Sequence, residues 1–237
     1  MVLVATRNPL NLGAAARAMS NFGFSRLRVV APYEAAYREA RSAVGASELL
    51  ANAEEYASVA EAVADCTLVV GTTAARNREL AHRLLQLEEG AGLIRQELRA
   101  GRVALLFGSE KRGLSNRDLS HCHWLLRLPT REEHPSMNLG QAVAVALYEV
   151  ARHPDASLPQ AAQARRLLVK LAAAGEIERL TSTLLETLRA SGYANSETAA
   201  AEEKVRRLIH RLQLDATDAE TLLGMLRQIL WKLRRER

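Results

Sequence analysis

The chain has 237 residues and a mass of 26.0 kDa, enough for one domain of about 150 residues and a smaller second one. Its 48% hydrophobic and 25% charged residues are typical of a globular protein and exclude a disordered or fibrous chain. The net charge is +5, of which residues 1–159 carry +1 and residues 160–237 carry +4. So small a surplus favours a polyanionic partner such as nucleic acid only slightly.

Cysteine content and the length of the apolar runs indicate the cellular compartment in which we expect the protein. Cys66 and Cys122 are too few for a disulfide framework, and reduced thiols are expected. The first nine residues lack the basic region of a signal peptide. No apolar run approaches the ~20 residues that span a bilayer. We therefore expect a cytoplasmic protein with no membrane partner.

Five short apolar runs predict buried strands, at residues 2–5, 27–30, 67–70, 103–107 and 124–128. They are continuous rather than alternating, which is typical of strands covered on both faces. The stretches between them are helical in period. The first 155 residues therefore predict an α/β domain with a mainly parallel sheet, whose ligands bind at the carboxyl ends of the strands.

Two prolines, Pro154 and Pro159, predict a boundary between a domain of residues 1–156 and a small all-helical module of residues 160–237. Apolar stripes predict its helices: Leu167, Leu168 and Leu171; Ile177, Leu180, Leu184 and Leu188, ended by Gly192; then Val205, Leu208, Ile209 and Leu212. A last helix is expected to open with the capping box Thr217-x-x-Glu220 and to bury Leu222, Leu223, Leu226, Ile229, Leu230 and Leu233.

Common nucleotide and hydrolase motifs do not fit. The first strand is followed by a single glycine, Gly13, which excludes the G-x-G-x-x-G dinucleotide fingerprint. Residues 108–115 have the glycine spacing of a P-loop, but Leu114 stands where the phosphate-binding lysine is needed. There is no H-E-x-x-H and no G-x-S-x-G. A nucleoside triphosphatase and these hydrolase classes are therefore disfavoured.

The tripeptide His121-Cys122-His123 invites a metal interpretation. Adjacent residues on an extended chain point to opposite sides, and no further close pair supplies the remaining ligands of a tetrahedral site. We therefore predict no metal and an ordinary strand entry.

Three polar, glycine-containing loops follow strands, at residues 8–17, 107–116 and 129–138. They predict a site that holds a small polar ligand mainly by backbone groups. Their segments NLGAAARAM (11–19), LFGSEKRGLSN (106–116) and PSMNLGQAV (135–143) resemble, in order and spacing, the three motifs of the SPOUT (SpoU/TrmH) RNA ribose 2′-O-methyltransferases. Residues 69–76 (VVGTTAAR) and the helical tail are most similar to the TrmJ branch, which methylates a pyrimidine ribose in the tRNA anticodon loop.

The resemblance implies a deep trefoil knot at the carboxyl end of the α/β domain, with S-adenosylmethionine bound there in a bent conformation. Composition and periodicity could not show a knot, because threaded chains are nearly absent among folds. The resemblance also implies a homodimer with active sites at the subunit interface. Residues 142–147, apolar almost all round, fit a helix buried on both sides in such an interface.

By the same resemblance the catalytic residues are Arg17, Asn11, Glu110, Ser136 and Asn138. The cofactor-binding positions are Thr72, Thr73, Ala74, Gly108, Leu128, Ser136, Met137 and Asn138. Residue chemistry alone leaves structural alternatives open. Arg17 and Glu110 could be solvated charges, Asn11 and Asn138 could be helix caps, and Gly108 and Gly113 could serve plain turns.

Arg17 is a poor general base, because lowering a guanidinium pKa from near 13 to ~8 costs roughly 7 kcal/mol. We favour a role in which Arg17 holds a substrate phosphate and stabilises the ribose 2′-oxygen as charge develops on it. The methyl donor is a sulfonium that leaves as a neutral thioether, so in-line positioning of that oxygen carries much of the rate. Ser136 is too weak a base to remove the proton.

Eight basic side chains are candidate RNA phosphate contacts, and we expect about half of them to serve: Arg76, Arg78, Lys111, Arg112, Arg131, Arg206, Arg207 and Arg211. The spacing of Arg76-Asn77-Arg78 departs slightly from that of the branch.

Together these features predict a dimeric, S-adenosylmethionine-dependent tRNA (cytidine/uridine-2′-O-)-methyltransferase that acts at position 32 and uses no metal. Two alternatives stay open. One is a 2′-O-methyltransferase of another tRNA or rRNA ribose, such as a guanosine, and the other is a non-catalytic RNA-binding protein with the same knot.

Overall fold

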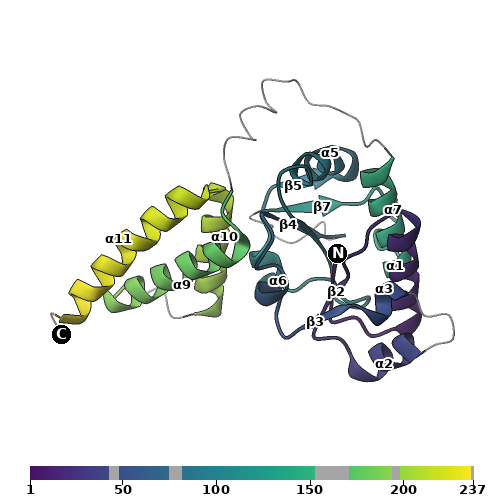
Figure 1. Ribbon diagram of the computed structural model, residues 1–237, viewed down its shortest axis with the longest axis horizontal. Coiled ribbons are helices and arrows are strands. Elements are labelled where there is room, and N and C mark those ends of the chain that lie inside the picture. Colours follow the sequence, from purple (N-terminus) through teal and green to yellow (C-terminus); the bar gives the residue numbers. More distant parts are fainter. Residues whose placement is uncertain (43–47, 75–81, 153–170, 194–197, 236–237) are drawn as a thin grey trace.

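The computed structural model describes residues 1–42, 48–74, 82–152, 171–193 and 198–235. Seven parallel strands in these ranges form one sheet in the order β3-β2-β1-β6-β4-β7-β5 (Figure 1). They are β1 (Val2–Val4), β2 (Arg28–Val30), β3 (Glu54–Tyr56), β4 (Leu68–Thr72), β5 (Leu84–Gln86), β6 (Val103–Phe107) and β7 (Trp124–Arg127). The predicted α/β class is confirmed, and the sheet is entirely parallel.

The five predicted strands are the five central ones, and the two edge strands were not predicted. β3 is Glu-Glu-Tyr and is only partly buried, so it carries no apolar run. β5, at the other edge, has one buried residue in three. Edge strands have a solvent-facing side, which removes the apolar signal on which the prediction depended.

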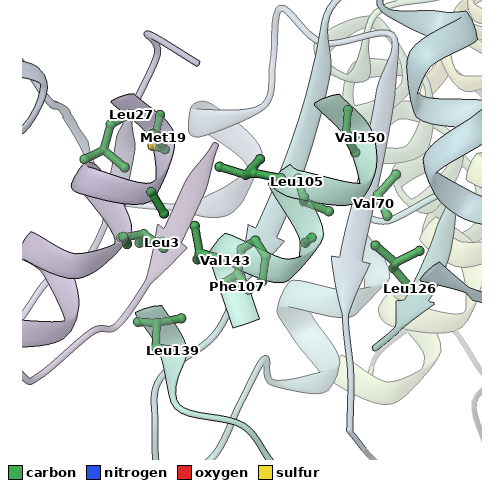
Figure 2. Close-up of a cluster of buried hydrophobic side chains, with 14 of the residues drawn as sticks. Leu3, Met19, Leu27, Val70, Leu105, Phe107, Leu126, Leu139, Val143 and Val150 are labelled. Atoms are coloured by element: carbon green, nitrogen blue, oxygen red, sulfur yellow. The ribbon is translucent and has the colours of Figure 1, made fainter. Parts of the chain in front are cut away.

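Alternate residues of the central strands face two separate cores, which explains their continuous apolar runs. On one face α1 (Pro9–Asn21), α5 (Leu87–Glu97) and α7 (Leu139–Ala151) cover side chains such as Leu3, Val70, Leu105, Phe107 and Leu126 (Figure 2). The short helices α2 (Glu34–Ser42) and α3 (Glu48–Ala51) pack beside α1. On the other face α4 (Val59–Ala62) and α6 (Asn116–Ser120) cover side chains such as Val2, Val69, Ala104, Leu106 and Leu125.

The tail is helical, as predicted, and consists of α9 (Ala174–Ala190), α10 (Ala199–Leu212) and α11 (Ala216–Arg235). Gly192, with φ of +80°, follows α9 and ends it. Leu171 was predicted to be helical, but it pairs with Asp215 in an isolated β-bridge. Leu167, Leu168, Pro154 and Pro159 lie outside the described residues. No helix of the described ranges is both long and apolar enough to cross a membrane.

Two predictions about the tail helices are wrong. Leu208 and Leu212 are about half exposed, because α10 turns Ile209 and His210 inward. Ile229 is also about half exposed, because α11 turns the neighbouring Leu230 inward. The capping box at Thr217 is also wrong. α11 begins at Ala216, and the preceding Asp215 accepts the backbone N–H of Asp218 at 2.8 Å. A carboxylate two residues before the expected cap therefore satisfies the first turn.

Polar contacts fasten the tail to the α/β domain. The Arg206 guanidinium of α10 binds both carboxylate oxygens of Glu178 on α9, at 2.9 and 3.0 Å, and contacts the Ser120 hydroxyl of α6 at 3.4 Å. At the start of α9, the Ala174 N–H donates to the Cys66 carbonyl at 2.8 Å. Arg206 is therefore a structural residue at the junction, although the sequence offered it as an RNA contact.

Three histidines are buried at the same junction. His123 leads into β7 as a strand entry, accepts the Val69 N–H at 3.0 Å through Nδ1, and meets the His210 ring edge-on at 4.8 Å. His121 Nδ1 lies 3.6 Å from a carboxylate oxygen of Glu178. Burial lowers the pKa of His121 and His123 to about 4, and the pKa of His210 well below its ordinary value. Within the described ranges no group of three His, Cys, Asp or Glu side chains is arranged so that it could hold a metal ion.

We predict that acid weakens the fold through these histidines. The pKa of a histidine is about 6.5 in the unfolded chain. As the pH falls from 6.5 toward 4, the unfolded chain therefore binds protons at these histidines that the folded chain does not bind. Each histidine with a folded pKa near 4 should cost roughly 2 kcal/mol of unfolding free energy between pH 6.5 and 5. Urea titrations at these pH values should show a smaller loss for His123→Asn, and an unchanged loss for the exposed His134→Gln. An equal loss in all three proteins would contradict the assignment.

We also predict opposite effects for two glycines of α5. A Cβ on Gly90 would lie 2.3 Å from Cδ1 of the fully buried Leu126, whereas a Cβ on Gly92 meets nothing closer than 3.9 Å. Gly90→Ala should lower the unfolding free energy by about 1–3 kcal/mol, because overpacking outweighs the helix propensity gained. Gly92→Ala should raise it by up to about 1 kcal/mol. Urea denaturation measures both, and a stabilising Gly90→Ala would contradict the packing of α5 on β7.

Candidate active site

The loop after β1 enters α1 through a helix cap. Asn8 Oδ1 accepts the Leu10 N–H at 2.9 Å, and Pro9 occupies the first helical position, where no N–H is required. The cap is therefore Asn8 and not Asn11. Asn11 lies inside the first turn, 7% exposed, and its side chain bonds to other loops.

Glu110, in the loop after β6, is a shared acceptor. Its carboxylate accepts Asn11 Nδ2 at 2.9 Å and the backbone N–H groups of Arg7 and Asn8 at 3.3 and 3.2 Å. Partial burial raises the pKa of Glu110, but the hydrogen bonds from Asn11 and from the backbone outweigh burial and hold the pKa below its ordinary value. Glu110 is thus an ionised acceptor that orders the loop after β1.

Asn138, in the loop after β7, has two functions at once. Its Oδ1 caps α7 by accepting the Gly140 N–H at 2.9 Å, and its Nδ2 donates to Asn11 Oδ1 at 2.8 Å. Asn138, Asn11 and Glu110 therefore form a continuous chain of hydrogen bonds, here called the relay. The relay joins the loops that follow three different strands.

A cavity of about 290 Å³ lies beside the relay, and Glu110 lines it. This volume is close to the ~300 Å³ lower end of small-molecule sites. Its wall combines apolar side chains with loop backbone, from Thr72, Thr73, Ala74, Phe107, Gly108, Ser109, Glu110, Lys111, Arg112, Gly113, Leu114, Leu119, Leu128, Thr130, Pro135, Ser136, Met137, Leu139 and Ala142. Such a wall suits a ligand with a flat apolar part and several hydrogen-bonding edges.

Glycine is required at two places in this wall. Gly113 has φ of +66° and donates its N–H to the Ser109 carbonyl at 2.8 Å, which turns the loop back on itself. A Cβ on Gly108 would lie 2.0 Å from the carbonyl carbon of Gly113. A side chain would clash at Gly108 and strain the backbone at Gly113, so loop backbone forms this part of the wall.

Thr72 and Thr73 contribute surface to the cavity wall, and each has a hydrogen-bond donor that is already used within the sheet. The Thr72 hydroxyl donates to the Leu106 carbonyl at 2.8 Å, and the Thr73 N–H donates to the Leu126 carbonyl at 3.1 Å. Both groups are thus committed to the sheet, and shape and backbone carbonyls are what these residues offer a ligand.

The cavity unites most of the site residues that the sequence suggested. Every proposed cofactor position except Asn138 lines it, and so do Glu110 and Ser136. Asn11 and Asn138 adjoin it through the relay. Arg17 is exposed on α1 and is not part of the wall. Arg76 and Arg78 lie outside the described residues.

Several wall residues were missed by sequence reasoning. Thr130 Oγ1 donates to the Pro135 carbonyl at 3.2 Å and braces the loop of residues 129–138. Leu119 reaches the cavity from α6, beyond the motif that precedes it. Leu114 is buried and packs in the second core. Its apolar side chain in a polar loop was the one available signal.

Comparisons with known proteins agree over most of the chain. Residues 1–148 match the family model described as SpoU rRNA Methylase family. The chain is 33% identical to tRNA (cytidine/uridine-2′-O-)-methyltransferase TrmJ of Sodalis glossinidius, over 97% of this chain and 90% of that protein. It is 34% identical to tRNA (cytidine/uridine/adenosine-2′-O-)-methyltransferase TrmJ of Pseudomonas aeruginosa, over 95% and 91%. The crystal structure of TrmJ from Z. mobilis ZM4 has a TM-score of 0.81 and 30% identity, covering 96% of this chain and 97% of that one.

We predict that Glu110→Gln lowers the unfolding free energy by about 1 kcal/mol at pH 7, because a partly solvated amide cannot replace a carboxylate that accepts three N–H groups. The unfolded pKa of a glutamate is about 4.3 and the folded pKa of Glu110 is lower. The wild-type advantage is therefore present above about pH 4.3 and fades as the pH falls through the folded pKa. Urea titrations at pH 7 and below pH 4 measure it, with the exposed Glu133→Gln as control. A difference that persists unchanged in acid would contradict it.

Proposed function

The chain belongs to the SpoU rRNA methylase family, and from that premise we propose that it methylates the ribose 2′-hydroxyl of cytidine or uridine at position 32 of the tRNA anticodon loop. The methyl donor in this proposal is S-adenosylmethionine, and the place of action is the cytoplasm. The observation that carries the proposal is the relay beside the cavity, because it assembles all three motif loops into one site.

The tRNA substrate is supported by how far the relatives match. The family model ends at residue 148, but the TrmJ relatives match 95–97% of the chain and therefore include the helical tail. Their names differ in the accepted nucleosides, cytidine and uridine in one and adenosine as well in the other. Cytidine and uridine are common to both, and we assign them to this chain.

The residues present fit S-adenosylmethionine. Leu128, Met137 and Leu114 give the cavity apolar surface for an adenine ring, and the glycine loop brings backbone N–H and C=O groups to its edge. When bound, the cofactor supplies an electrophilic methyl group on a sulfonium sulfur. The charged side chains of the described wall are Glu110, Lys111 and Arg112, so the fit to the cofactor rests on the apolar surface and the loop backbone.

The chain's own task is to hold and orient the ribose. The relay fixes Asn11 in the first turn of α1. Asn8 already accepts the N–H groups of that turn, so side chains are what hold a substrate phosphate. Arg17 lies on the same helix with an exposed guanidinium, to which no described carboxylate is paired. We assign Arg17 to the substrate phosphate and to the developing charge on the 2′-oxygen, which aligns that oxygen for in-line attack.

A homodimer would complete such a site. On α7, Val143, Ala146 and Leu147 are buried, whereas Ala144 and Val145 stay partly exposed in the single chain. A second copy packed on this face would bury them, in line with the expectation that this helix is covered on both sides. The deep knot implied by the family resemblance belongs to the same proposal.

Two other functions are disfavoured by particular observations. A ribose in another RNA is disfavoured by the match of the tail to tRNA enzymes. A non-catalytic RNA-binding protein is disfavoured because the relay is complete and every proposed cofactor position but one lines a single cavity. Calorimetry with S-adenosylmethionine separates this last function, which predicts no binding.

The proposed reaction is tested by mapping its product. The full-length protein is incubated with unmodified bulk tRNA and S-adenosylmethionine, and the modified nucleotide is located by nuclease digestion and mass spectrometry. We expect 2′-O-methylcytidine or 2′-O-methyluridine at position 32. A methyl group on a base atom, or on no tRNA ribose, would overturn the proposal.

We predict that Arg17→Lys retains part of the tRNA affinity and loses most of the turnover, by roughly 10²-fold or more, because a point charge replaces a planar group that aligns two oxygens. Single-turnover rates and tRNA binding measured together separate the two effects. Arg234→Lys, at the far end of α11, is the matched control for replacing a guanidinium with an ammonium group. Near wild-type turnover in Arg17→Lys would exclude this role.

A further inference from the structure

A second, larger hollow of about 880 Å³ lies between the α/β domain and the tail, and we call it the junction cleft. One wall is the end of β1 with residues 109–118, and the other is one face of α10. Ala200, Glu203 and Arg207 recur on that face at helical spacing, and His82 completes the lining. In Figure 1, α10 lies beside α6, which places the junction cleft where the tail meets the domain.

The junction cleft is strongly basic. Five cationic side chains line it, against two carboxylates: Arg7, Lys111, Arg112, Arg117 and Arg207 against Asp118 and Glu203. Asp118 is engaged with Ser115, whose N–H and hydroxyl it accepts at 2.8 and 2.6 Å. Of the cations only Arg207 has an ion pair with a described residue, at 3.7 Å from Glu203. The remaining charges are available to an anion.

The lining also shows which part of an RNA would fit. No phenylalanine, tyrosine or tryptophan is among the described lining residues, so the junction cleft offers no platform on which bases could stack. Guanidinium and ammonium groups recognise phosphate instead. Burial, more than the charges of Arg207 and Arg211, lowers the pKa of His82 to about 4, so this ring is a neutral part of the lining.

The junction cleft adjoins the cofactor cavity. Ser109, Lys111, Arg112, Gly113 and Leu119 line both hollows, so one loop separates them. An RNA strand that lies in the junction cleft therefore reaches the edge of the site at which its ribose would react.

We propose that the junction cleft binds the sugar–phosphate backbone of the substrate RNA next to the target nucleotide, with Arg117 and Arg207 contacting phosphates from opposite walls. This inference rests on the proposed tRNA methyltransferase function. It assigns the tail a precise contribution: α10 forms one wall, whereas Arg206, one residue earlier, holds α10 in place through Glu178. Recognition here depends on charge and shape rather than on base identity.

The test measures binding of an unmodified tRNA transcript across a range of salt concentrations. Arg117→Gln and Arg207→Gln should each weaken binding about 5- to 20-fold at low salt and flatten the slope of log affinity against log salt by about 1. Glu203→Gln, which frees Arg207 and removes a carboxylate, should tighten binding a few-fold. Arg234→Gln removes one tail charge outside the junction cleft and should change binding less than about 2-fold. Arg117, Glu203 and Arg207 do not line the cofactor cavity, so S-adenosylmethionine affinity should stay the same in all four variants.

The outcomes are separable. If the wild type methylates tRNA but both cleft variants bind it with unchanged affinity and slope, the junction cleft is not the RNA site and the proposed function stands. If Arg234→Gln weakens tRNA binding as much as Arg207→Gln does, the overall positive charge of the tail accounts for the binding and the junction cleft does not, so the proposal fails. If the two cleft variants lose affinity for a polyglutamate peptide but keep their affinity for tRNA, the occupant of the junction cleft is an acidic protein and the proposal is overturned. A wild type that neither binds nor methylates tRNA would overturn both proposals. Arg117 is exposed, so its variant remains informative if Arg207→Gln loosens the tail.

Discussion

The site depends on one ionised carboxylate that lies at the meeting point of three loops. Glu110 accepts two backbone N–H groups of the loop after β1 and the amide of Asn11, and Asn11 in turn accepts the amide of Asn138. These contacts join positions about 100 residues apart in the chain. Without them each loop would end its own strand independently. With them, the loops form one wall around the cavity and fix the entrance of α1.

A second set of polar contacts decides where the tail lies. Arg206 binds Glu178 and Ser120, and the buried rings of His123 and His210 pack edge-on behind them. A partly buried ion pair and neutral histidines specify an orientation more than they add stability, because each group costs free energy to remove from water. The pairing of these charged and polar groups therefore orients the tail. The junction cleft exists because α10 is held in that orientation.

Sequence reasoning predicted the parts of the fold that bury apolar surface on both sides. All five central strands were found, whereas β3 and β5 were missed because edge strands need no apolar run. The stripe on α10 was misplaced at Leu208 and Leu212, because Ile209 and His210 form the buried face of that helix. The motif loops identified the cavity wall. The link between Asn11 and Asn138 in the relay was not predicted, since which amides meet depends on how α1 packs against α7.

The central claim is that the three loops act as one unit through the relay. A double-mutant cycle on S-adenosylmethionine affinity tests it most directly, with Glu110→Ala, Asn138→Ala and the double variant measured by calorimetry. Among the described contacts these two residues do not bond each other, and Asn11 bonds both. We expect the two losses to be strongly non-additive. The double variant should lose about as much affinity as the single variant that binds the cofactor less tightly, which corresponds to a coupling free energy between the two residues of about 1 kcal/mol or more. Additive losses would show that the loops bind the cofactor independently and would contradict it.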